Sequence, residues 1–156
     1  FVASLTEAIA ANALPPSSLE VEITEGMVME DVESTIGTLR VLKDIGVSIA
    51  IDDFGTGFSS LAYLQRLPVD VMKVDRAFVS GIGGGGSAER IAEMIVALGR
   101  TLSLQTVAEG VETADQLDIV RRWGCQIVQG YYHAPPMAPE AFEAWVRRRR
   151  TGGPGA

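Results

Sequence analysis

A run that alternates apolar and polar residues, followed by a run with helical periodicity, recurs along this chain. The alternating runs occupy residues 19–24, 47–52, 70–75, 103–110 and 125–132. Strands that alternate with helices of this length predict right-handed βαβ units around a parallel sheet. The predicted fold class is therefore α/β.

Two of the intervening segments carry an apolar stripe at helical spacing. In residues 31–46 the stripe consists of Val32, Ile36, Leu39 and Leu42, and in residues 87–99 it consists of Ile91, Met94, Ile95 and Leu98. Gly46 predicts the end of the first helix. Thr113 and Gln116 predict the start of a later helix, because they have capping-box spacing.

The predicted strands separate apolar from polar side chains, which alternate between the two faces of a strand. In the first strand, one face carries Leu19, Val21 and Ile23 and the other carries Glu20, Glu22 and Thr24. The next two strands show the same division. One apolar and one polar face suits a barrel with helices outside and a site at the carboxyl ends of its strands. A doubly wound sheet, which is apolar on both faces, is the alternative.

The number of units is smaller than a complete barrel requires. A (β/α)8 TIM-type barrel has eight strands and typically ~250 residues. This chain has 156 residues and shows roughly five strands. If the barrel interpretation holds, we expect only about the last five βα units here, with the remaining strands upstream of Phe1.

Composition and charge narrow the class of protein. A formal net charge of -7 argues against DNA binding, which needs a basic surface, and would repel an anionic ligand unless cations intervene. No run approaches the ~20 apolar residues of a membrane span, so we expect no membrane segment. The single cysteine, Cys125, suits a reducing compartment. We therefore expect a cytoplasmic domain, alone or as the cytoplasmic part of a membrane-anchored protein.

Charged and polar residues gather where the predicted strands end. They are Glu22, Asp52, Asp53, Lys73, Asp75, Glu109 and Gln129. Carboxylates at one rim repel one another unless cations compensate. Mg²⁺ and Mn²⁺ prefer oxygen ligands, and an aspartate pair can serve two ions ~3.5–4 Å apart. Two such ions could activate a water for attack on a phosphodiester, with Lys73 holding that water or the developing charge.

Each of these residues also has a purely structural interpretation. An Asp-Asp pair after a strand is commonly a turn or a helix cap. Lys73 could pair with Asp75 or with a neighbouring carboxylate. Glu112 could be a solvated or salt-bridged residue, and Gln129 could bond backbone groups near a glycine turn.

Four stretches of sequence favour the functional interpretation over the structural one. They are EITE at 22–25, IDDFGTGFSSLAYLQRLPVDVMKVDRAFV at 51–79, TVAEGVET at 106–113 and CQIVQGYY at 125–132. Their residues, order and spacing closely resemble those of the EAL domain family. Members of that family are cyclic di-GMP phosphodiesterases with a βα-barrel fold, so the resemblance implies a barrel of the EAL type.

The resemblance implies a role for individual residues. Glu22, Asp52 and Asp53 match metal ligands, Glu109 matches an acidic residue needed for the metals or for proton transfer, and Lys73 matches the lysine that positions the attacking water. Glu25 matches the glutamate that holds the following loop, here Phe54, Gly55, Thr56 and Gly57, and that loop also contributes to dimerisation in the family. Gln129, Glu112 and Asp75 match further positions of the site.

Two family motifs are missing from this sequence. The early E-A-L segment, whose glutamate binds metal, and an asparagine on the next strand are both absent. We therefore expect residues 1–148 to form the C-terminal portion of an EAL barrel and residues 149–156 to form a basic, Gly/Pro-containing tail or linker. By itself this portion is expected to be inactive.

The predicted function is hydrolysis of cyclic di-GMP to linear pGpG with two Mg²⁺ or Mn²⁺ ions. The first alternative is an inactive EAL-like domain that binds cyclic di-GMP as a receptor, and the second is a different metal-dependent barrel enzyme. The resemblance further implies a homodimer through the loop after Asp52 and Asp53. It also implies fusion to GGDEF or sensory domains.

Overall fold

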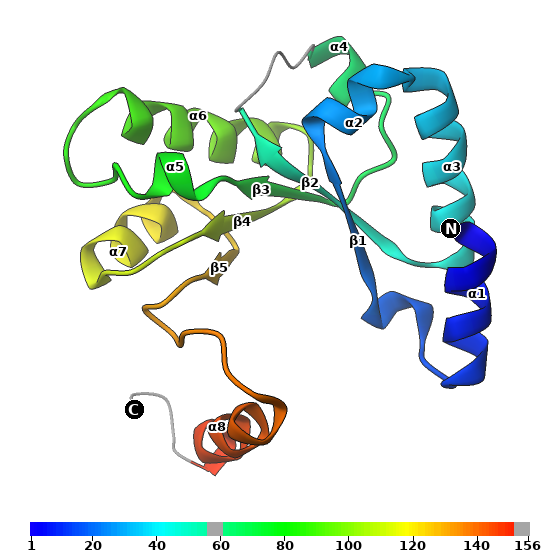
Figure 1. Ribbon diagram of the computed structural model, residues 1–156. Coiled ribbons are helices and arrows are strands. Elements are labelled where there is room, and N and C mark those ends of the chain that lie inside the picture. The colour runs from blue at the N-terminus through cyan, green and yellow to red at the C-terminus, as the bar shows by residue number, and fades with distance from the viewer. Residues whose placement is uncertain (56–60, 152–156) are drawn as a thin grey trace.

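The computed structural model describes residues 1–55 and 61–151, which form five strands, helices that pack around them and a C-terminal helix that lies apart from the sheet (Figure 1). In chain order the elements are α1 (Val2–Ala11), the 3-10 turn η1 (Pro16–Ser18), β1 (Glu20–Thr24), α2 (Glu25–Glu30), α3 (Val32–Ile45), β2 (Ser48–Phe54), α4 (Leu61–Leu64), β3 (Val71–Val74), α5 (Arg76–Val79), α6 (Ser87–Thr101), β4 (Gln105–Glu109), α7 (Ala114–Trp123), β5 (Ile127–Gln129) and α8 (Pro139–Thr151).

The strands form one parallel sheet whose spatial order, β1-β2-β3-β4-β5, follows the chain order. A doubly wound sheet reverses its order at a switch point, and the described strands contain no such reversal. Right-handed crossovers between successive neighbours return on the same side of the sheet, so the helices collect on one face, as in a βα-barrel. The predicted α/β class and the partial barrel are confirmed.

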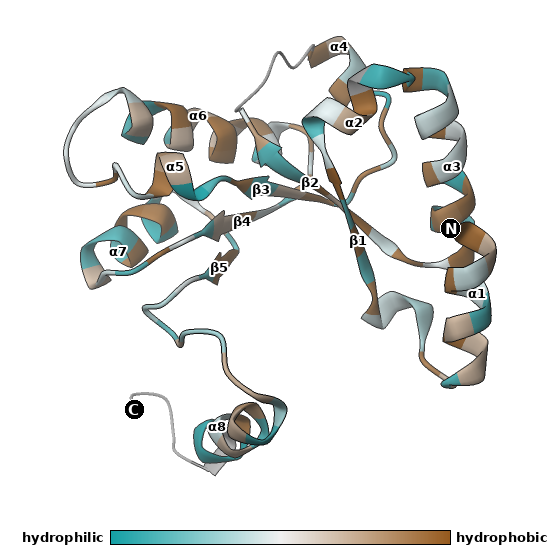
Figure 2. Cartoon of the chain, viewed as in Figure 1, coloured by the Kyte–Doolittle hydropathy of each residue, from teal (hydrophilic) through white to brown (hydrophobic). Residues whose placement is uncertain are grey.

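The two faces of the sheet differ as the alternation predicted. The helix-covered face contributes Ile49, Ile51, Met72 and Val74 to the main core. On the opposite face, Ala50, Val71 and Val107 form a small separate cluster. Polar residues follow two positions later on the same three strands, and Figure 2 shows β2 turning from hydrophobic to hydrophilic near its carboxyl end.

One predicted helical stripe is confirmed, and the other needs a correction. In α3, Ile36, Leu39 and Leu42 are buried, and the helix ends at Gly46 with a φ of 98°. In α6, Met94 was predicted on the buried face but is 60% exposed. The buried residues are Ala92, Ile95, Val96 and Gly99, because α6 approaches the sheet through Gly99.

Four strands are shorter than predicted, β1 and β3 by one or two residues and β4 and β5 by more. β4 begins at Gln105, since Ser103 has a left-handed φ of 59° that a strand does not accommodate. β5 ends at Gln129, because Gly130 turns the chain against Val111, where a Cβ would lie 2.1 Å from the Val111 carbonyl oxygen. The capping box of Thr113 and Gln116 is present at the start of α7.

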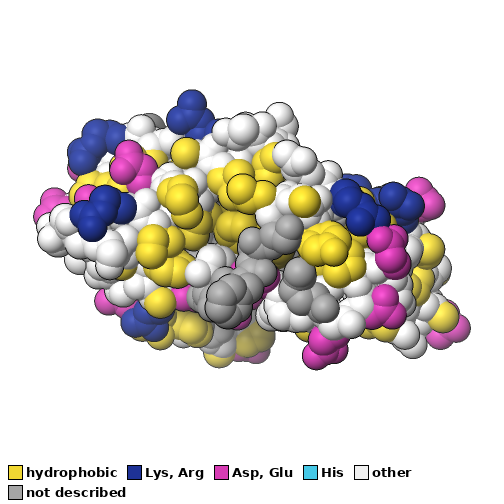
Figure 3. Space-filling view, turned by 90° about the horizontal axis from the view of Figure 1, so that it is seen from above, with side chains coloured by type: hydrophobic (Ala, Val, Ile, Leu, Met, Phe, Trp, Pro, Cys, Tyr) yellow, Lys and Arg dark blue, Asp and Glu magenta, His cyan; other side chains and the backbone are white. Residues whose placement is uncertain are grey.

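Exposed apolar side chains gather on the side of the molecule that Figure 3 shows from above. Met27 of α2, Leu61 and Tyr63 of α4 and Met94 of α6 are all exposed, and these helices lie at the top of Figure 1. Figure 3 shows hydrophobic side chains on both sides of the residues drawn in grey. We refer to Met27, Leu61, Tyr63 and Met94 as the apolar rim.

The lengths and compositions of the helices can be compared with those of membrane spans. Within residues 1–55 and 61–151, none of the helices combines the length and apolar character that crossing a membrane requires.

The contact between α6 and β4 generates a prediction about stability. A Cβ at Gly99 would lie 2.3 Å from Cγ2 of Thr106, which is fully buried and whose hydroxyl donates to Gln126 at 2.6 Å. We expect Gly99→Ala to lower the free energy of unfolding by about 1–3 kcal/mol, measured by urea unfolding.

Gly37→Ala is the matched control, because a Cβ at Gly37 in α3 would meet no atom within 4 Å. It should raise the free energy of unfolding by about 0.5–1 kcal/mol through helix propensity. Equal effects of the two substitutions would contradict close packing at Gly99.

Candidate functional site

The end of β2 has an irregular backbone that presents two acidic residues in succession. The register between β2 and β3 shifts between Ile51 and Phe54, and Asp53 has a left-handed φ of 53°. The Asp53 backbone N–H donates to Oδ1 of Asp52 at 2.9 Å. This local hydrogen bond stabilises an unusual conformation that Asp tolerates better than most residues.

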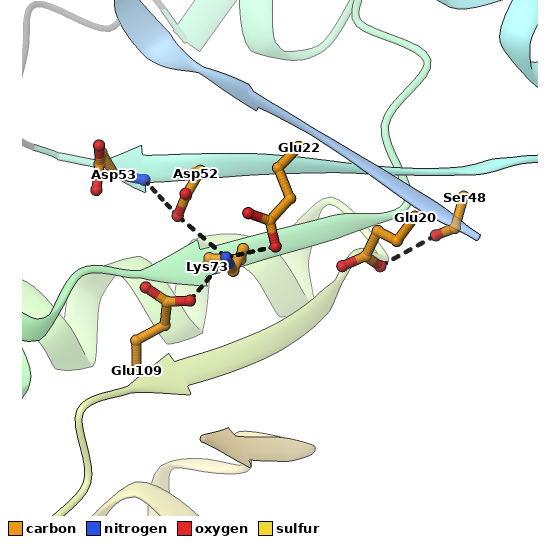
Figure 4. Close-up of polar contacts among 7 residues, drawn as sticks. All are labelled: Glu20, Glu22, Ser48, Asp52, Asp53, Lys73 and Glu109. Carbon is orange, nitrogen blue, oxygen red and sulfur yellow. Dashed lines mark hydrogen bonds and ion pairs between the residues drawn. The ribbon is translucent and has the colours of Figure 1, made fainter. Parts of the chain in front are cut away.

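Lys73 lies at the centre of a cluster formed by four neighbouring strands (Figure 4). Its Nζ is 2.7 Å from Oε1 of Glu22 on β1, 2.7 Å from Oε1 of Glu109 on β4 and 3.4 Å from Oδ1 of Asp52 on β2. The Lys73 side chain is only 6% exposed. Of the two pairings left open by the sequence, Lys73 therefore pairs with neighbouring carboxylates.

The charges in this cluster perturb one another. Burial alone would lower the pKa of Lys73, but hydrogen bonds to Glu109 and Glu22 outweigh burial and raise it above its usual value. Burial also raises the pKa of Glu109, against the opposing effect of Lys73. For Asp53, burial and the nearby carboxylates of Asp52 and Asp75 raise the pKa. The cluster therefore carries more negative charge than its single ammonium neutralises.

The carboxylates suit divalent ions in donor type and in charge. Glu22, Asp52, Asp53 and Glu109 offer only oxygen atoms, which Mg²⁺ and Mn²⁺ prefer. No three His, Cys, Asp or Glu side chains within residues 1–55 and 61–151 are grouped as a preformed metal site. Three of the carboxylates instead converge on the Lys73 ammonium. The donor set and the unneutralised charge fit the predicted ions, whereas the side chains are arranged around the lysine.

Glu25 connects the end of β1 to the chain that follows Asp53. It is buried at the start of α2, and its Oε2 accepts from the Gly55 backbone N–H at 3.3 Å. Its Oε1 is buried and has no hydrogen-bond partner among the residues described. Gly55 has a φ of 95°, and a Cβ there would lie 2.9 Å from Cδ1 of Ile95. Only glycine fits this position.

The other residues predicted for the loop are Phe54, Thr56 and Gly57. Phe54 is buried in the main core, so its side chain contributes to packing. Thr56 and Gly57 fall outside the described residues.

The remaining predicted residues lie at strand ends but outside the Lys73 cluster. Asp75 caps α5 by accepting from the Ala77 N–H at 2.8 Å. The Glu112 carboxylate pairs with Arg76 at 2.7 Å. Gln129 ends β5 with an exposed side chain, and its carbonyl accepts from the Val111 N–H at 3.1 Å.

Arg76 was missed by the sequence analysis. A Cβ at Gly110 would lie 2.3 Å from Cγ of Arg76, so the arginine stem packs over that glycine, directly after Glu109. The available signal was spacing, because Arg76 and Glu112 each follow a residue of the cluster by three positions, Lys73 and Glu109 respectively.

Comparison with known proteins adds independent information. Residues 1–136 match the sequence profile described as the EAL domain. The chain is 47% identical over 132 residues to a protein named cyclic di-GMP phosphodiesterase NbdA from Pseudomonas aeruginosa, covering 85% of this chain and 17% of NbdA. It is 44% identical over 145 residues to the bifunctional diguanylate cyclase/cyclic di-GMP phosphodiesterase MucR of the same organism, covering 93% of this chain and 21% of MucR.

A solved structure is also similar to this chain. The structure described as the MucR phosphodiesterase in complex with c-di-GMP matches with a TM-score of 0.87 and 44% identity, covering 90% of this chain and 57% of that chain. The chain thus spans about a fifth of the length of these curated relatives.

The raised pKa of Asp53 generates a prediction about stability without metal. Its ionised form is harder to reach in the folded state than in the unfolded state, so the charge destabilises the fold above the folded pKa. Below the unfolded pKa both states are protonated and this effect vanishes. We expect Asp53→Asn to raise the melting temperature in EDTA at pH 8, by an amount that shrinks as the pH falls toward 4.

The pH dependence separates charge from backbone strain. Asn also tolerates the φ of 53°. Any effect of backbone conformation on the melting temperature does not change with pH. Asp44→Asn, on the exposed surface of α3, is the control and should leave the melting temperature unchanged at both values. A stabilisation by Asp53→Asn that is constant with pH would contradict the charge argument.

Proposed function

Because the chain belongs to the EAL domain family, we propose that the protein hydrolyses cyclic di-GMP to linear pGpG in a reaction that depends on Mg²⁺ or Mn²⁺. The observation that carries this proposal is the convergence of Glu22, Asp52 and Glu109 on Lys73 from four adjacent strands. An anionic substrate could not approach such an acidic cluster without cations. The metal dependence and the substrate are therefore parts of one proposal.

The chain's own residues have distinct tasks in this reaction. Glu22, Asp52, Asp53 and Glu109 hold two divalent ions. When bound, these ions supply a water activated at neutral pH and positive charge beside the phosphate. The Lys73 ammonium holds the attacking water or the charge that develops on phosphate oxygens. Glu109, which lies 2.7 Å from the Lys73 ammonium, serves either the metals or proton transfer.

Residues outside the cluster position the reacting groups. Glu25 fixes the backbone at Gly55, two residues after Asp53, and so orients the aspartate pair. Asp75 keeps the start of α5 in place beside Asp53. Gln129, Glu112 and Arg76 lie at the edge of the site, where they would contact the substrate outside the scissile phosphodiester.

We propose that this activity needs further strands of the same domain. Strands β1 and β5 are the two edges of the described sheet, and neither has an outer partner among the residues described. The MucR structure extends well beyond the portion matched by this chain. In this proposal residues 1–148 are the C-terminal part of the barrel and an upstream part supplies the missing ligands. Residues 149–156 are a tail or linker that begins within the last turn of α8.

We propose that two copies associate through the apolar rim and the loop after Asp53. Met27, Leu61, Tyr63 and Met94 expose apolar surface on α2, α4 and α6, and Figure 3 shows hydrophobic side chains gathered on this side of the molecule. Exposed apolar surfaces of this kind commonly mark interfaces. Fusion to a GGDEF or sensory domain within the cytoplasm remains part of the proposal. Its support is the name of MucR, which combines diguanylate cyclase and phosphodiesterase activities.

The decisive experiment is conversion of cyclic di-GMP to pGpG by the full-length protein with Mg²⁺, Mn²⁺ or chelator. We expect metal-dependent turnover that Asp53→Asn reduces by about 10³-fold or more, a loss of ~4 kcal/mol of transition-state stabilisation. Asp44→Asn is the matched control and should retain the wild-type rate. Tight binding of cyclic di-GMP without turnover would instead identify a receptor.

Glu25→Ala tests the positioning role of the buried carboxylate. We expect turnover to fall by about 10²-fold through misplacement of the aspartate pair, and amide hydrogen exchange at Gly55 to accelerate because its acceptor is lost. Glu30→Ala, at the exposed end of the same helix, is the control. An unchanged rate together with unchanged exchange at Gly55 would rule this role out.

The proposed association is tested by sedimentation velocity. We expect a dimer that Met94→Glu converts to monomer, because a charge on the apolar rim opposes burial. Val41→Glu, on the exposed surface of α3, should leave the dimer intact. A wild-type protein that sediments as a monomer at all concentrations would contradict the interface.

A further inference from the structure

We propose that Lys73 is the resident counter-ion of Glu22, Asp52 and Glu109, and that divalent ions bind by displacing its ammonium from at least one of these carboxylates. The lysine then assembles the carboxylates before metal arrives and competes with metal for them. This inference rests on the proposed metal dependence, but it concerns binding and not turnover.

The contacts of the ammonium are the first support. A lysine ammonium has three N–H donors, and three carboxylates surround this one, at 2.7, 2.7 and 3.4 Å. The side chain is 6% exposed, so water can replace few of these contacts. An ion that takes an oxygen from this cluster therefore removes a partner that Lys73 cannot readily replace.

The surroundings of Lys73 fix the backbone from which its side chain extends. Its neighbours on the same face of the sheet, Val71 and Val107, are buried in the small apolar cluster with Ala50. Lys73 pairs in register with Val107, between strands that are paired on both sides. The backbone of the cluster is thus fixed by the sheet, and the side chains are the parts that can rearrange.

The charges supply the second support. Three carboxylates around one ammonium leave an excess of two negative charges, which attracts divalent cations. The ammonium repels those cations, and this coupling acts equally in both directions. Removing the Lys73 charge should therefore strengthen ion binding and weaken the metal-free fold, a pair of opposite effects that a merely structural ion pair does not produce.

The first test observes Lys73 directly in the wild-type, full-length protein. Its side-chain ¹⁵Nζ resonance is assigned as the signal absent from the spectrum of Lys73→Met and is followed during titration with MgCl₂. We expect this signal to shift with saturating behaviour. Lys43, the other lysine of the chain, pairs with Asp70 away from the cluster, so its signal should stay in place.

The second test compares variants without relying on turnover. Lys73→Met keeps the length of the stem but removes the charge, and Lys43→Met is the matched control. By calorimetry, Lys73→Met should bind Mg²⁺ about tenfold more tightly than the wild type. In EDTA its melting temperature should fall by about 5 °C or more, and saturating Mg²⁺ should restore most of that loss. Lys43→Met should not alter Mg²⁺ affinity.

The outcomes separate this inference from the proposed function. A Lys73 signal unmoved by about 20 mM Mg²⁺ overturns the inference, as does unchanged or weaker Mg²⁺ binding by a folded Lys73→Met protein. If hydrolysis of cyclic di-GMP still occurs in the wild type, the proposed function survives that result. If the signal shifts while cyclic di-GMP is not hydrolysed, the inference stands and the proposed function fails.

Discussion

Parallel pairing of strands in chain order determines which side chains of this protein can meet. β1 to β4 pair side by side, and side chains at their carboxyl ends share one edge of the sheet. Glu22, Asp52, Lys73 and Glu109 are far apart in the sequence and come together only through this pairing. The helices on the other face bury the apolar half of each strand, which leaves the polar half for the site.

The cost of collecting these charges explains several features around them. Carboxylates that are crowded together repel one another, and the Lys73 ammonium offsets part of that cost for three of them at once. Partial burial raises the pKa of Glu109 despite its contact with Lys73, and burial together with the neighbouring carboxylates raises the pKa of Asp53. A fold stabilised by core packing elsewhere can tolerate such a region, and strained or electrostatically unfavourable clusters are typical of functional sites.

Alternation within strands and helical periodicity made the class of fold and the polar face of the sheet predictable, because both depend on local spacing. The residues of the four motifs identified the family. The candidate residues at the strand ends followed from these motifs and from the predicted topology. The partners of Lys73 were not predictable, since five carboxylates lie at or near the ends of the same strands and only three of them contact the ammonium. Met94 was assigned to the wrong face because the close approach at Gly99 decides how α6 rotates. Arg76 was overlooked because its packing on Gly110 depends on tertiary contact.

The apolar rim and the charged cluster are connected through α6. Met94 lies on the exposed surface of this helix, whereas the next residue, Ile95, is fully buried against Gly55. The room for a side chain at Gly55 is already filled by Ile95 and Phe78, so the backbone there cannot move independently of them. Glu25 holds the same glycine from the other side through its N–H. Packing therefore connects the helix that carries Met94 with Gly55, two residues from Asp53.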